Sequence, residues 1–180
     1  VILFIFSWLF PIIGLLIKLN SKGPVFFVQK RTGINNKTFN CLKFRTMTVN
    51  AESDSQQAQK NDSRITSIGD FLRKTNIDEM PQFINVLLGN MSVVGPRPHM
   101  LKHTDQYSQL IQHYKVRHFV KPGITGWAQV NGYRGITDEL WKMEKRVEYD
   151  MDYLEHWTFF WDIKIIFMTV FGNKAFKNAG

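Results

Sequence analysis

The chain opens with an apolar run that basic residues follow at once. Residues 1–17 are apolar apart from Ser7, and Lys18 and Lys22 come soon after them. A cleaved signal peptide has the opposite order, with its charge before the apolar run and small residues at a cleavage site after it. The order found here therefore favours a retained membrane element. Under the positive-inside tendency, it also predicts that the following domain lies on the cytoplasmic face.

Pro11 restricts how this run can enter a membrane. Proline removes a backbone hydrogen bond, so the helix should be kinked or broken near its middle, and the run is shorter than the about 20 residues that a spanning helix needs. Two membrane arrangements stay open: the end of a kinked spanning helix, and a re-entrant hairpin that returns to the same face. A buried core helix is the alternative without a membrane. Because the chain begins without Met, we expect further segments upstream.

Length and charge narrow the class of protein. The 180 residues suit one domain with a real core. Lys and Arg number 23 against 15 Asp and Glu, a net charge of +8, which favours an anionic partner such as nucleic acid, a phosphorylated metabolite or anionic lipid. The single cysteine, Cys41, excludes an internal disulfide framework and fits a reducing compartment. The five histidines have no ligand spacing, so no Cys/His metal cluster is expected.

The residue pattern predicts an α/β fold that is predominantly helical with few short strands. Two β-like runs, within 23–33 and 39–47, are separated by turn residues and should form a hairpin. Residues 121–132 are turn-rich and should contain one short strand at most, and no parallel βαβ repeat is visible. Helical spacing recurs at 68–72, 80–88, 103–119 and 138–156.

Two further segments each allow two interpretations. Residues 48–66 are polar and nearly free of large apolar side chains, which predicts a solvated loop or helix: either a mobile lid or a plain surface excursion. Residues 157–171 are rich in Trp and Phe around Asp162 and Lys164, and are too short and too charged to span a bilayer. That composition favours a helix in the membrane interface, with a core helix as the alternative.

An acidic pair, Asp78 and Glu79, occurs at the predicted start of the helix over 80–88. Adjacent carboxylates repel each other unless a cation, a basic neighbour or the positive end of a helix dipole stabilises them. Thr75 has the spacing of an N-cap and Pro81 suits a first helical turn, so ordinary helix capping is one explanation.

The arginines of the chain suggest a second explanation for the acidic pair. Arg97 stands between two prolines, which would present its guanidinium at low entropic cost. Arg31, Arg45 and Arg73 occur in turn-flanked or rigid contexts as well. Acids that bind a divalent cation or attack phosphorus, arginines that bind phosphate and an apolar element that reaches a lipid together indicate phosphoryl chemistry at a membrane. Mg²⁺ is the expected metal, because oxygen ligands and phosphate suit it.

At these residues the chain resembles the bacterial sugar transferases, which are monotopic polyprenyl-phosphate phosphoglycosyl transferases. The resemblance covers nearly the whole sequence. It rests on blocks in a fixed order: Lys43 to Met47, Leu72-Arg73, Asp78 to Gln82, Gly95 to Pro98, Lys121 to Gly132, and Asp150 with Tyr153 and Trp157. Residues 132–137 and 142–146 look most like members that transfer glucose 1-phosphate, although galactose 1-phosphate or an N-acetylated sugar stays possible.

The resemblance implies a reaction and a location. Members transfer a sugar 1-phosphate from a UDP-sugar to undecaprenyl phosphate with release of UMP, which starts exopolysaccharide or glycan assembly. The UDP-sugar expected here is UDP-glucose. The expected location is the bacterial inner membrane, with a membrane-embedded helix over 1–19 and a catalytic domain over 20–180 on the cytoplasmic face. The start looks like the family's re-entrant helix, broken at Pro11, although Phe10 precedes this proline. Lipid is an expected partner, a homodimer is possible, and nucleic acid is not expected.

The resemblance also implies roles for individual residues. Asp78 would be the nucleophile that forms an acyl-phosphate sugar intermediate, and Glu79 would bind Mg²⁺ or handle the incoming phosphate. Asp78 and Glu79 are also the expected metal ligands. The expected substrate-binding residues are Lys43, Arg45, Arg73, Arg97 and Asp150. Structural roles are the alternatives for two of them: Arg97 could brace its own turn, and Asp150 could pair with a basic residue of its helix.

Two other functions remain compatible with the sequence. A membrane-bound adaptor with a basic face would use Asp78 and Glu79 only as a cap, but it leaves the flanking arginines unexplained. A nucleotide-sugar pyrophosphatase would keep the metal chemistry and use water as the acceptor. Dependence of transfer on polyprenyl phosphate separates the second of these from a transferase.

Overall fold

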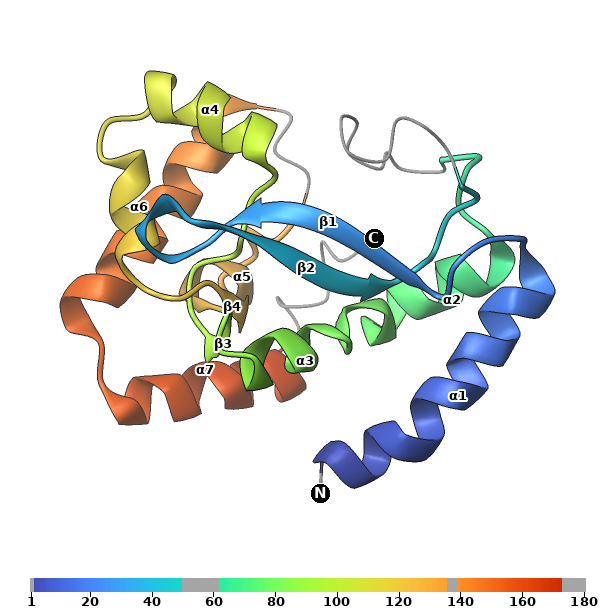
Figure 1. Ribbon diagram of the computed structural model, residues 1–180. Coiled ribbons are helices and arrows are strands. Elements are labelled where there is room, and N and C mark those ends of the chain that lie inside the picture. Colours follow the sequence, from blue (N-terminus) through green and yellow to red (C-terminus); the bar gives the residue numbers. More distant parts are fainter. Residues whose placement is uncertain (1, 50–61, 136–138, 173–180) are drawn as a thin grey trace. The chain divides into compact units, whose positions relative to one another are not determined.

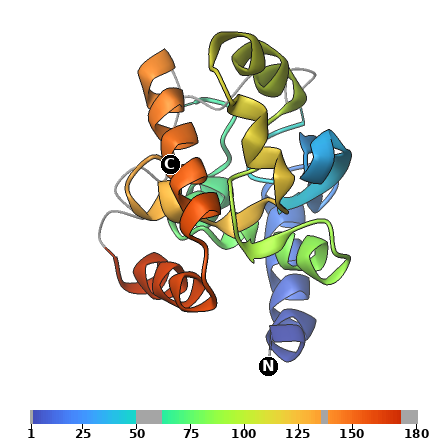
Figure 2. The same cartoon turned by 90° about the vertical axis from the view of Figure 1, so that its left-hand side faces the viewer.

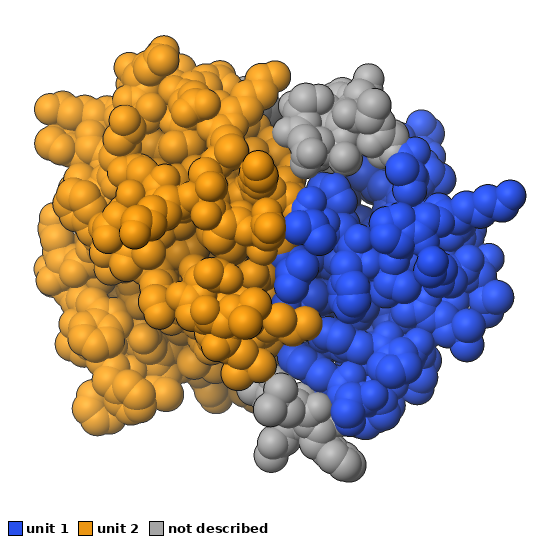
Figure 3. Space-filling model, in the orientation of Figure 1, with its two compact units in different colours: residues 1–28, 42–81, 180 blue, residues 29–41, 82–179 orange. Residues whose placement is uncertain are grey.

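The computed structural model describes residues 2–49, 62–135 and 139–172. Residues 50–61, most of the predicted lid, lie outside the described residues. The chain divides into two compact units, residues 1–28 with 42–81 and residues 29–41 with 82–179 (Figure 3). We call them unit 1 and unit 2 and describe each by itself.

The apolar start forms helix α1 (Ile2–Asn20) in unit 1. Pro11 lies inside this helix, which continues beyond it to Asn20, so of the two predicted effects of the proline a break is excluded and a kink is the one left (Figure 1). Ile13 and Ile17 of α1 are buried, whereas other apolar side chains of the helix stay exposed. Within the described part of the chain, no helix has the length and hydropathy needed to cross a membrane.

Unit 1 has a core that joins α1 to the end of strand β2 (Thr38–Phe44) and to helix α2 (Ser67–Lys74). Ile13 and Ile17 pack there with Phe44 and Leu72. The helix is capped by Thr66, whose hydroxyl accepts a hydrogen bond from the Gly69 N–H at 3.0 Å. A Cβ at Gly69 would overlap the backbone of Thr46. Glycine at this position therefore allows α2 to lie directly against the chain that follows the strand.

Strands β1 (Phe26–Thr32) and β2 (Thr38–Phe44) pair and run in opposite directions, which confirms the predicted hairpin (Figure 1). Their turn contains the short 3-10 helix η1 (Ile34–Asn36), and the Gly33 N–H donates to the Lys37 carbonyl at 2.8 Å. Asn35 and Asn36 both have positive φ, a conformation that asparagine tolerates better than most residues.

The chain after α2 passes through a 3-10 turn, η2 (Ile77–Glu79), into α3 (Gln82–Leu87). The predicted role of Thr75 as an N-cap is wrong, because Thr75 ends α2 and its hydroxyl donates to the Phe71 carbonyl at 2.8 Å. Asn76 follows with φ of 57° and turns the chain into η2. The predicted helix over 80–88 is confirmed as the shorter α3, and Gly89 ends it with φ of 78°.

Unit 2 contains a parallel pair of three-residue strands, β3 (Ser92–Val94) and β4 (Gly123–Thr125), with Ser92 opposite Gly123. The strand predicted within 121–132 is confirmed, whereas its parallel pairing with β3 through a single crossover was not predicted from the sequence. The connection contains α4 (Leu101–Leu110) and the 3-10 helix η3 (Tyr114–Phe119). The single helix predicted over 103–119 is also wrong, because His113 has φ of 62° and divides it.

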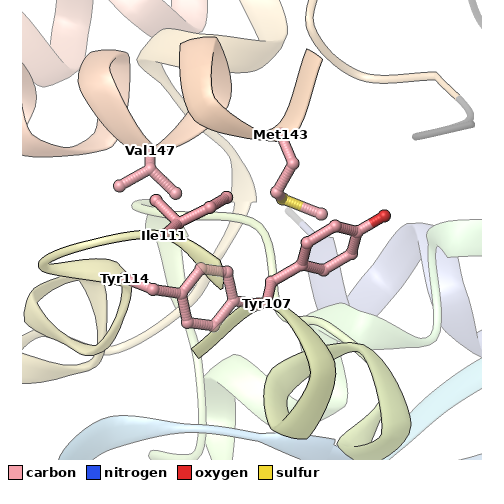
Figure 4. Close-up of a cluster of buried hydrophobic side chains, with 5 residues drawn as sticks. All are labelled: Tyr107, Ile111, Tyr114, Met143 and Val147. Atoms are coloured by element: carbon pink, nitrogen blue, oxygen red, sulfur yellow. The ribbon is translucent and has the colours of Figure 1, made fainter. Parts of the chain in front are cut away.

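Three helices complete unit 2: α5 (Trp127–Val130), α6 (Leu140–His156) and α7 (Phe159–Phe171). The helix predicted over 138–156 is confirmed as α6, and α7 turns away from it after a short break (Figures 1 and 2). One hydrophobic cluster joins α4 and η3 to α6: Tyr107, Ile111, Tyr114, Met143 and Val147 (Figure 4). A second joins β3, α5, α6 and α7: Val94, Val130, Tyr153 and Ile165.

We predict that Gly123→Ala destabilises the protein, because a Cβ at Gly123 would overlap backbone atoms of Gly95 and Thr125. Neither strand backbone can move away without breaking the pairing, so the loss in free energy of unfolding should be about 3 kcal/mol. Gln109→Ala on the exposed face of α4 is the control and should change it by less than about 0.5 kcal/mol. Thermal unfolding of both variants measures this, and equal stabilities would contradict the close approach.

Candidate functional site

The acidic pair lies on η2, between α2 and α3, and the unit 1 core holds this turn on both sides. Ile77 and Met80, the residues that flank Asp78 and Glu79, are both packed against the core of Ile13, Ile17, Phe44 and Leu72. A 3-10 turn has about three residues per turn, so adjacent side chains point in different directions. Asp78 and Glu79 can therefore occupy different environments although they are neighbours in sequence.

The two carboxylates do differ in burial. Glu79 is 6% exposed, and its Oε1 lies 2.7 Å from the Lys43 Nζ of β2. The Lys43 side chain is 20% exposed, so the ion pair is largely shielded from solvent. Asp78 is half-buried and more accessible than Glu79. Two carboxylates in contrasting environments are suited to different chemical roles.

Arg45 and Arg73 lie in the same unit as the acidic pair. Arg45 is buried and donates to the turn that joins α1 to β1, with Nε 2.6 Å from the Pro24 carbonyl and Nη1 2.8 Å from the Ser21 hydroxyl. Burial lowers the pKa of Arg45. Arg73 is half-buried in the last turn of α2, a few residues before Asp78. In this structure the contacts of Arg45 hold the chain that follows α1.

A metal at the acidic pair would need ligands from elsewhere. The described residues contain no group of three or more His, Cys, Asp or Glu side chains that could hold a metal ion. Mg²⁺ usually binds through one or two carboxylates together with phosphate oxygens and water. Asp78 and Glu79 therefore fit a Mg²⁺ that is shared with a phosphate-bearing substrate.

Arg97 follows β3 and lies in the segment 96–99 of unit 2, which we call the Pro-Arg-Pro segment. Each of the four carbonyls of this segment accepts a hydrogen bond. From residue 96 to residue 99 the donors are the Gly123 N–H at 2.9 Å, the Arg117 guanidinium at 2.9 Å, the Arg31 guanidinium at 3.0 Å and the Thr32 N–H at 3.1 Å. Arg97 itself is half-buried. The backbone that carries its side chain is thus fixed at every residue.

Asp150 belongs to a buried polar cluster of unit 2. Its carboxylate lies 2.7 Å from the Arg117 guanidinium, and the two side chains are 2% and 1% exposed. This partner comes from η3, whereas the sequence suggested a basic residue of the same helix, α6; Lys145 of α6 pairs with Glu148. The His99 ring lies 2.7 Å from the Arg117 Nη1 and 2.6 Å from the Tyr114 hydroxyl.

Arg146 completes this cluster. Its guanidinium donates to the carbonyls of Tyr133 at 2.8 Å and Gly135 at 2.9 Å, and lies 3.1 Å from the His99 ring. Arg146 thereby ties α6 to residues 133–135, part of the stretch that suggested a preference for glucose in the sequence.

Burial sets the charges in the cluster. It lowers the pKa of His99 well below its usual value, with the Arg117 and Arg146 charges acting in the same direction, so His99 is neutral at pH 7. Burial, with the Arg117 and Arg97 charges acting in the same direction, lowers the pKa of Arg146 to about 9. Burial raises the pKa of Asp150, against the opposite effect of Arg117. The cluster therefore holds two guanidiniums and a single carboxyl group, a positive balance next to Arg97.

The structure brings Lys43 and Glu79 together in unit 1, and links Arg97 to Asp150 through Arg117 in unit 2. Sequence reasoning missed Arg117, since it belongs to no recognisable motif. A signal did exist on α6, where two charged residues, Arg146 and Asp150, share the buried face of the helix with Met143 and Val147. Charged residues on an apolar helix face indicate buried partners elsewhere.

The chain belongs to the bacterial sugar transferase family, because the sequence model of this family matches residues 1–174. It is 55% identical over 179 residues to a UDP-glucose:undecaprenyl-phosphate glucose-1-phosphate transferase of Escherichia coli strain K12, covering 98% of this chain. A UDP-N-acetylgalactosamine-undecaprenyl-phosphate N-acetylgalactosaminephosphotransferase of Aeromonas hydrophila is 44% identical over 168 residues, or 92% of this chain. The exopolysaccharide production protein PSS of Rhizobium leguminosarum bv. phaseoli is 48% identical over 163 residues, 88% of this chain.

These relatives differ in length. The chain spans 38% of the E. coli protein and 39% of the A. hydrophila protein, but 82% of the R. leguminosarum protein. The shared region contains the acidic pair and the Pro-Arg-Pro segment, because the family match includes both.

We predict that Lys43→Met destabilises the protein by about 2 kcal/mol, because it removes the ammonium that neutralises the buried Glu79 carboxylate. The double variant Lys43→Met/Glu79→Gln should recover at least half of this loss. Lys74→Met is the matched control, since Lys74 pairs with Asp70 at 2.6 Å in the same unit but both side chains are more than half exposed. Chemical denaturation measures all three, and equal losses in the two lysine variants would contradict the prediction.

We predict that stability falls as the pH is lowered from 7 to 5. Burial lowers the pKa of His118 to about 4, from 6.5, and also lowers those of His99 and His103. At a pH between the folded and the unfolded pKa of a histidine, the unfolded chain binds more protons than the folded one, so acid favours unfolding. His118 should contribute about 1 kcal/mol to this loss after allowance for solvent screening.

Two variants separate the titration of His118 from its contact with Asn36, whose Oδ1 lies 2.7 Å from the His118 ring. Both His118→Asn and Asn36→Gly remove the contact, and glycine suits the positive φ at residue 36. Only His118→Asn should flatten the dependence of the unfolding temperature on pH. Equal slopes in the two variants would show that His118 does not cause the loss.

Proposed function

We propose that the protein transfers glucose 1-phosphate from UDP-glucose to undecaprenyl phosphate and releases UMP. The observation that carries this proposal is the contrast between Asp78 and Glu79, one accessible and one neutralised by Lys43, on a turn held by the core. A pair of carboxylates with different environments suits a nucleophile beside a second acid. The 55% identity to a glucose-1-phosphate transferase supports the same reaction.

Asp78 is the nucleophile in this proposal. Its carboxylate oxygen attacks the sugar-bearing phosphorus of UDP-glucose, and the bond from that phosphorus to the bridging oxygen breaks, so UMP leaves. The resulting acyl phosphate holds glucose 1-phosphate on Asp78. An oxygen of undecaprenyl phosphate then attacks the same phosphorus, which restores the carboxylate and yields undecaprenyl diphosphate glucose. This sequence predicts ping-pong kinetics.

Glu79 and Lys43 act beside the nucleophile as a shielded ion pair. The pair keeps Glu79 in place next to Asp78 and puts an ammonium close to the reacting phosphates, where developing negative charge needs stabilisation. Asp78 and Glu79 would also hold Mg²⁺ together with phosphate oxygens, and the ion would offset the repulsion between the carboxylate and the diphosphate.

The remaining predicted site residues divide into two groups. Arg73 and Arg97 are half-buried, which leaves their guanidiniums suited to bind phosphate oxygens. Arg45 and Asp150 are buried and engaged by the turn after α1 and by Arg117. We therefore propose that Arg45 and Asp150 support the substrate site through the backbone and through Arg117.

Two helices supply the proposed contact with the cytoplasmic face of the bacterial inner membrane, and each exposes large apolar side chains. On α1 these are Trp8, Ile12, Leu15, Leu16 and Leu19. On α7 they are Phe159, Phe160, Ile163, Ile166, Phe167, Val170 and Phe171. Exposed apolar stripes of this size mark surfaces that bind lipid or protein. A lipid-bound phosphate acceptor makes lipid the occupant that the proposed reaction requires.

We predict that the parent protein, incubated with UDP-glucose and Mg²⁺ without a lipid acceptor, gains the mass of one glucosyl phosphate and releases UMP. Asp78→Asn should gain none and should lose at least about a thousandfold in turnover with undecaprenyl phosphate present. Intact-protein mass spectrometry measures the adduct. Asp70→Asn, which removes an exposed acid on α2, is the control and should label like the parent.

Other results would favour a different function. Continued UMP release without an adduct and without a lipid acceptor would indicate hydrolysis, the reaction of a nucleotide-sugar pyrophosphatase. Full turnover by Asp78→Asn would overturn the nucleophile. Labelling by UDP-N-acetylgalactosamine in place of UDP-glucose would change the sugar and leave the mechanism intact.

A further inference from the structure

The Pro-Arg-Pro segment needs donors from outside its own strand. Pro96 and Pro98 lack an N–H, and the segment extends beyond β3, so its carbonyls cannot be satisfied by a strand ladder alone. Backbone N–H groups serve the first and last carbonyls, whereas guanidiniums serve the carbonyls of Arg97 and Pro98. Hydrogen bonds from charged donors are stronger than neutral ones, so these two bonds fix the backbone firmly.

Arg117 is placed to hold this segment and is itself held. Its guanidinium donates to the Arg97 carbonyl at 2.9 Å and forms an ion pair with Asp150 at 2.7 Å. The His99 ring is a further neighbour at 2.7 Å. A guanidinium fork can meet several such partners at fixed angles, which a single ammonium cannot do. The side chain is 1% exposed, so it does not reach a substrate in solution.

Arg31 supports the next residue from another element. It lies on β1 and donates to the Pro98 carbonyl at 3.0 Å, while its other terminal nitrogen donates to the Gln29 side chain at 2.5 Å. Arg31 is half-buried, and its strand also forms a bridge to Met100. Two arginines, Arg117 and Arg31, thus donate to consecutive backbone carbonyls, those of Arg97 and Pro98.

We propose that Arg117 and Arg31 are positioning residues that set the orientation of Arg97, and that Asp150 acts by orienting Arg117. The inference rests on the proposed function, in which Arg97 binds the diphosphate of the sugar nucleotide. An error of about 1 Å in such a group can cost a hundredfold in rate. If the orientation of Arg97 depends on the buried Arg117 and the half-buried Arg31, this would explain why charged residues occupy this part of the core.

The test of the structural step is hydrogen exchange at the Gly123 and Thr32 amides, whose N–H groups donate to the Pro96 and His99 carbonyls at the two ends of the Pro-Arg-Pro segment. Arg117→Lys keeps the charge but not the fork, and should speed exchange there about tenfold or more. Val147→Ala is the matched control, because it weakens the core one turn before Asp150 on α6 without touching the segment. It should leave exchange at these amides unchanged. Unchanged exchange in Arg117→Lys would overturn the proposal.

The test of the functional step is a double-mutant cycle in the membrane-embedded protein. Arg117→Lys should lower kcat/KM for UDP-glucose by about 10- to 100-fold. Adding it to Arg97→Ala should cause less than about a twofold further loss, because both changes disable the same group. Val147→Ala should keep kcat/KM within about twofold of the parent. Independent, multiplying losses for Arg117 and Arg97, or near-normal activity of Arg117→Lys, would overturn the proposal.

Two further outcomes are decisive. If Arg117→Lys does not fold, Arg31→Lys takes its place, with faster exchange at the Thr32 amide and the same coupling to Arg97→Ala as the expected results. If the parent releases no UMP from UDP-glucose, the proposed function fails. In that case, faster exchange in Arg117→Lys would still establish that Arg117 holds the segment. The proposed role of the segment in this reaction, however, would be overturned.

Discussion

The close approach of two glycine-containing backbones is the constraint on which unit 2 depends. β3 and β4 are only three residues long, and a Cβ at Gly95, Gly123 or Gly126 would overlap the opposite backbone. The Gly95 N–H donates to the Thr125 carbonyl, where both strands end, and the Gly123 N–H, at the start of β4, donates to the Pro96 carbonyl, so hydrogen bonds hold the two backbones together. Parallel strands direct their carboxyl ends to one edge, where α/β proteins place ligand-binding residues. The Pro-Arg-Pro segment begins at that edge, and its carbonyls are then available to the guanidiniums.

The buried charges next to this segment are not the most stable way to fill a core. A buried ion pair is often no better than apolar residues of the same volume, because desolvation opposes the attraction. Here the cluster contains two guanidiniums and one carboxyl group. The excess positive charge is stabilised by hydrogen bonds from the guanidiniums to the backbone carbonyls of Arg97, Tyr133 and Gly135. Each contact fixes a loop. Fixing the backbone around Arg97, the arginine proposed to bind an anion, is a benefit that an apolar core cannot provide.

Local pattern predicted much of the fold, and long-range contacts account for what it missed. The repeat of apolar residues located α6, and turn residues between two β-like runs located the hairpin, because both signals lie within a short stretch. Three-residue strands are too short to show a period, so the β3–β4 pair and its crossover could not be seen. Thr75 has the spacing of a cap in the sequence, but the fold ends α2 there. Motif reasoning named Asp78, Glu79 and Arg97 as candidate site residues, but it gave no indication of Arg117, whose partners are remote in sequence.

The acidic pair shows why adjacency of two carboxylates can be an advantage. In a 3-10 turn neighbouring side chains diverge by roughly a third of a turn, so one acid can enter the core while the other remains accessible. Ile77 and Met80 hold the turn in the hydrophobic core of unit 1, and Lys43 neutralises Glu79 from the end of β2. The repulsion that Glu79 would exert on Asp78 is thereby reduced. In the proposed reaction, this leaves the Asp78 carboxylate on a rigid turn from which it would attack phosphorus.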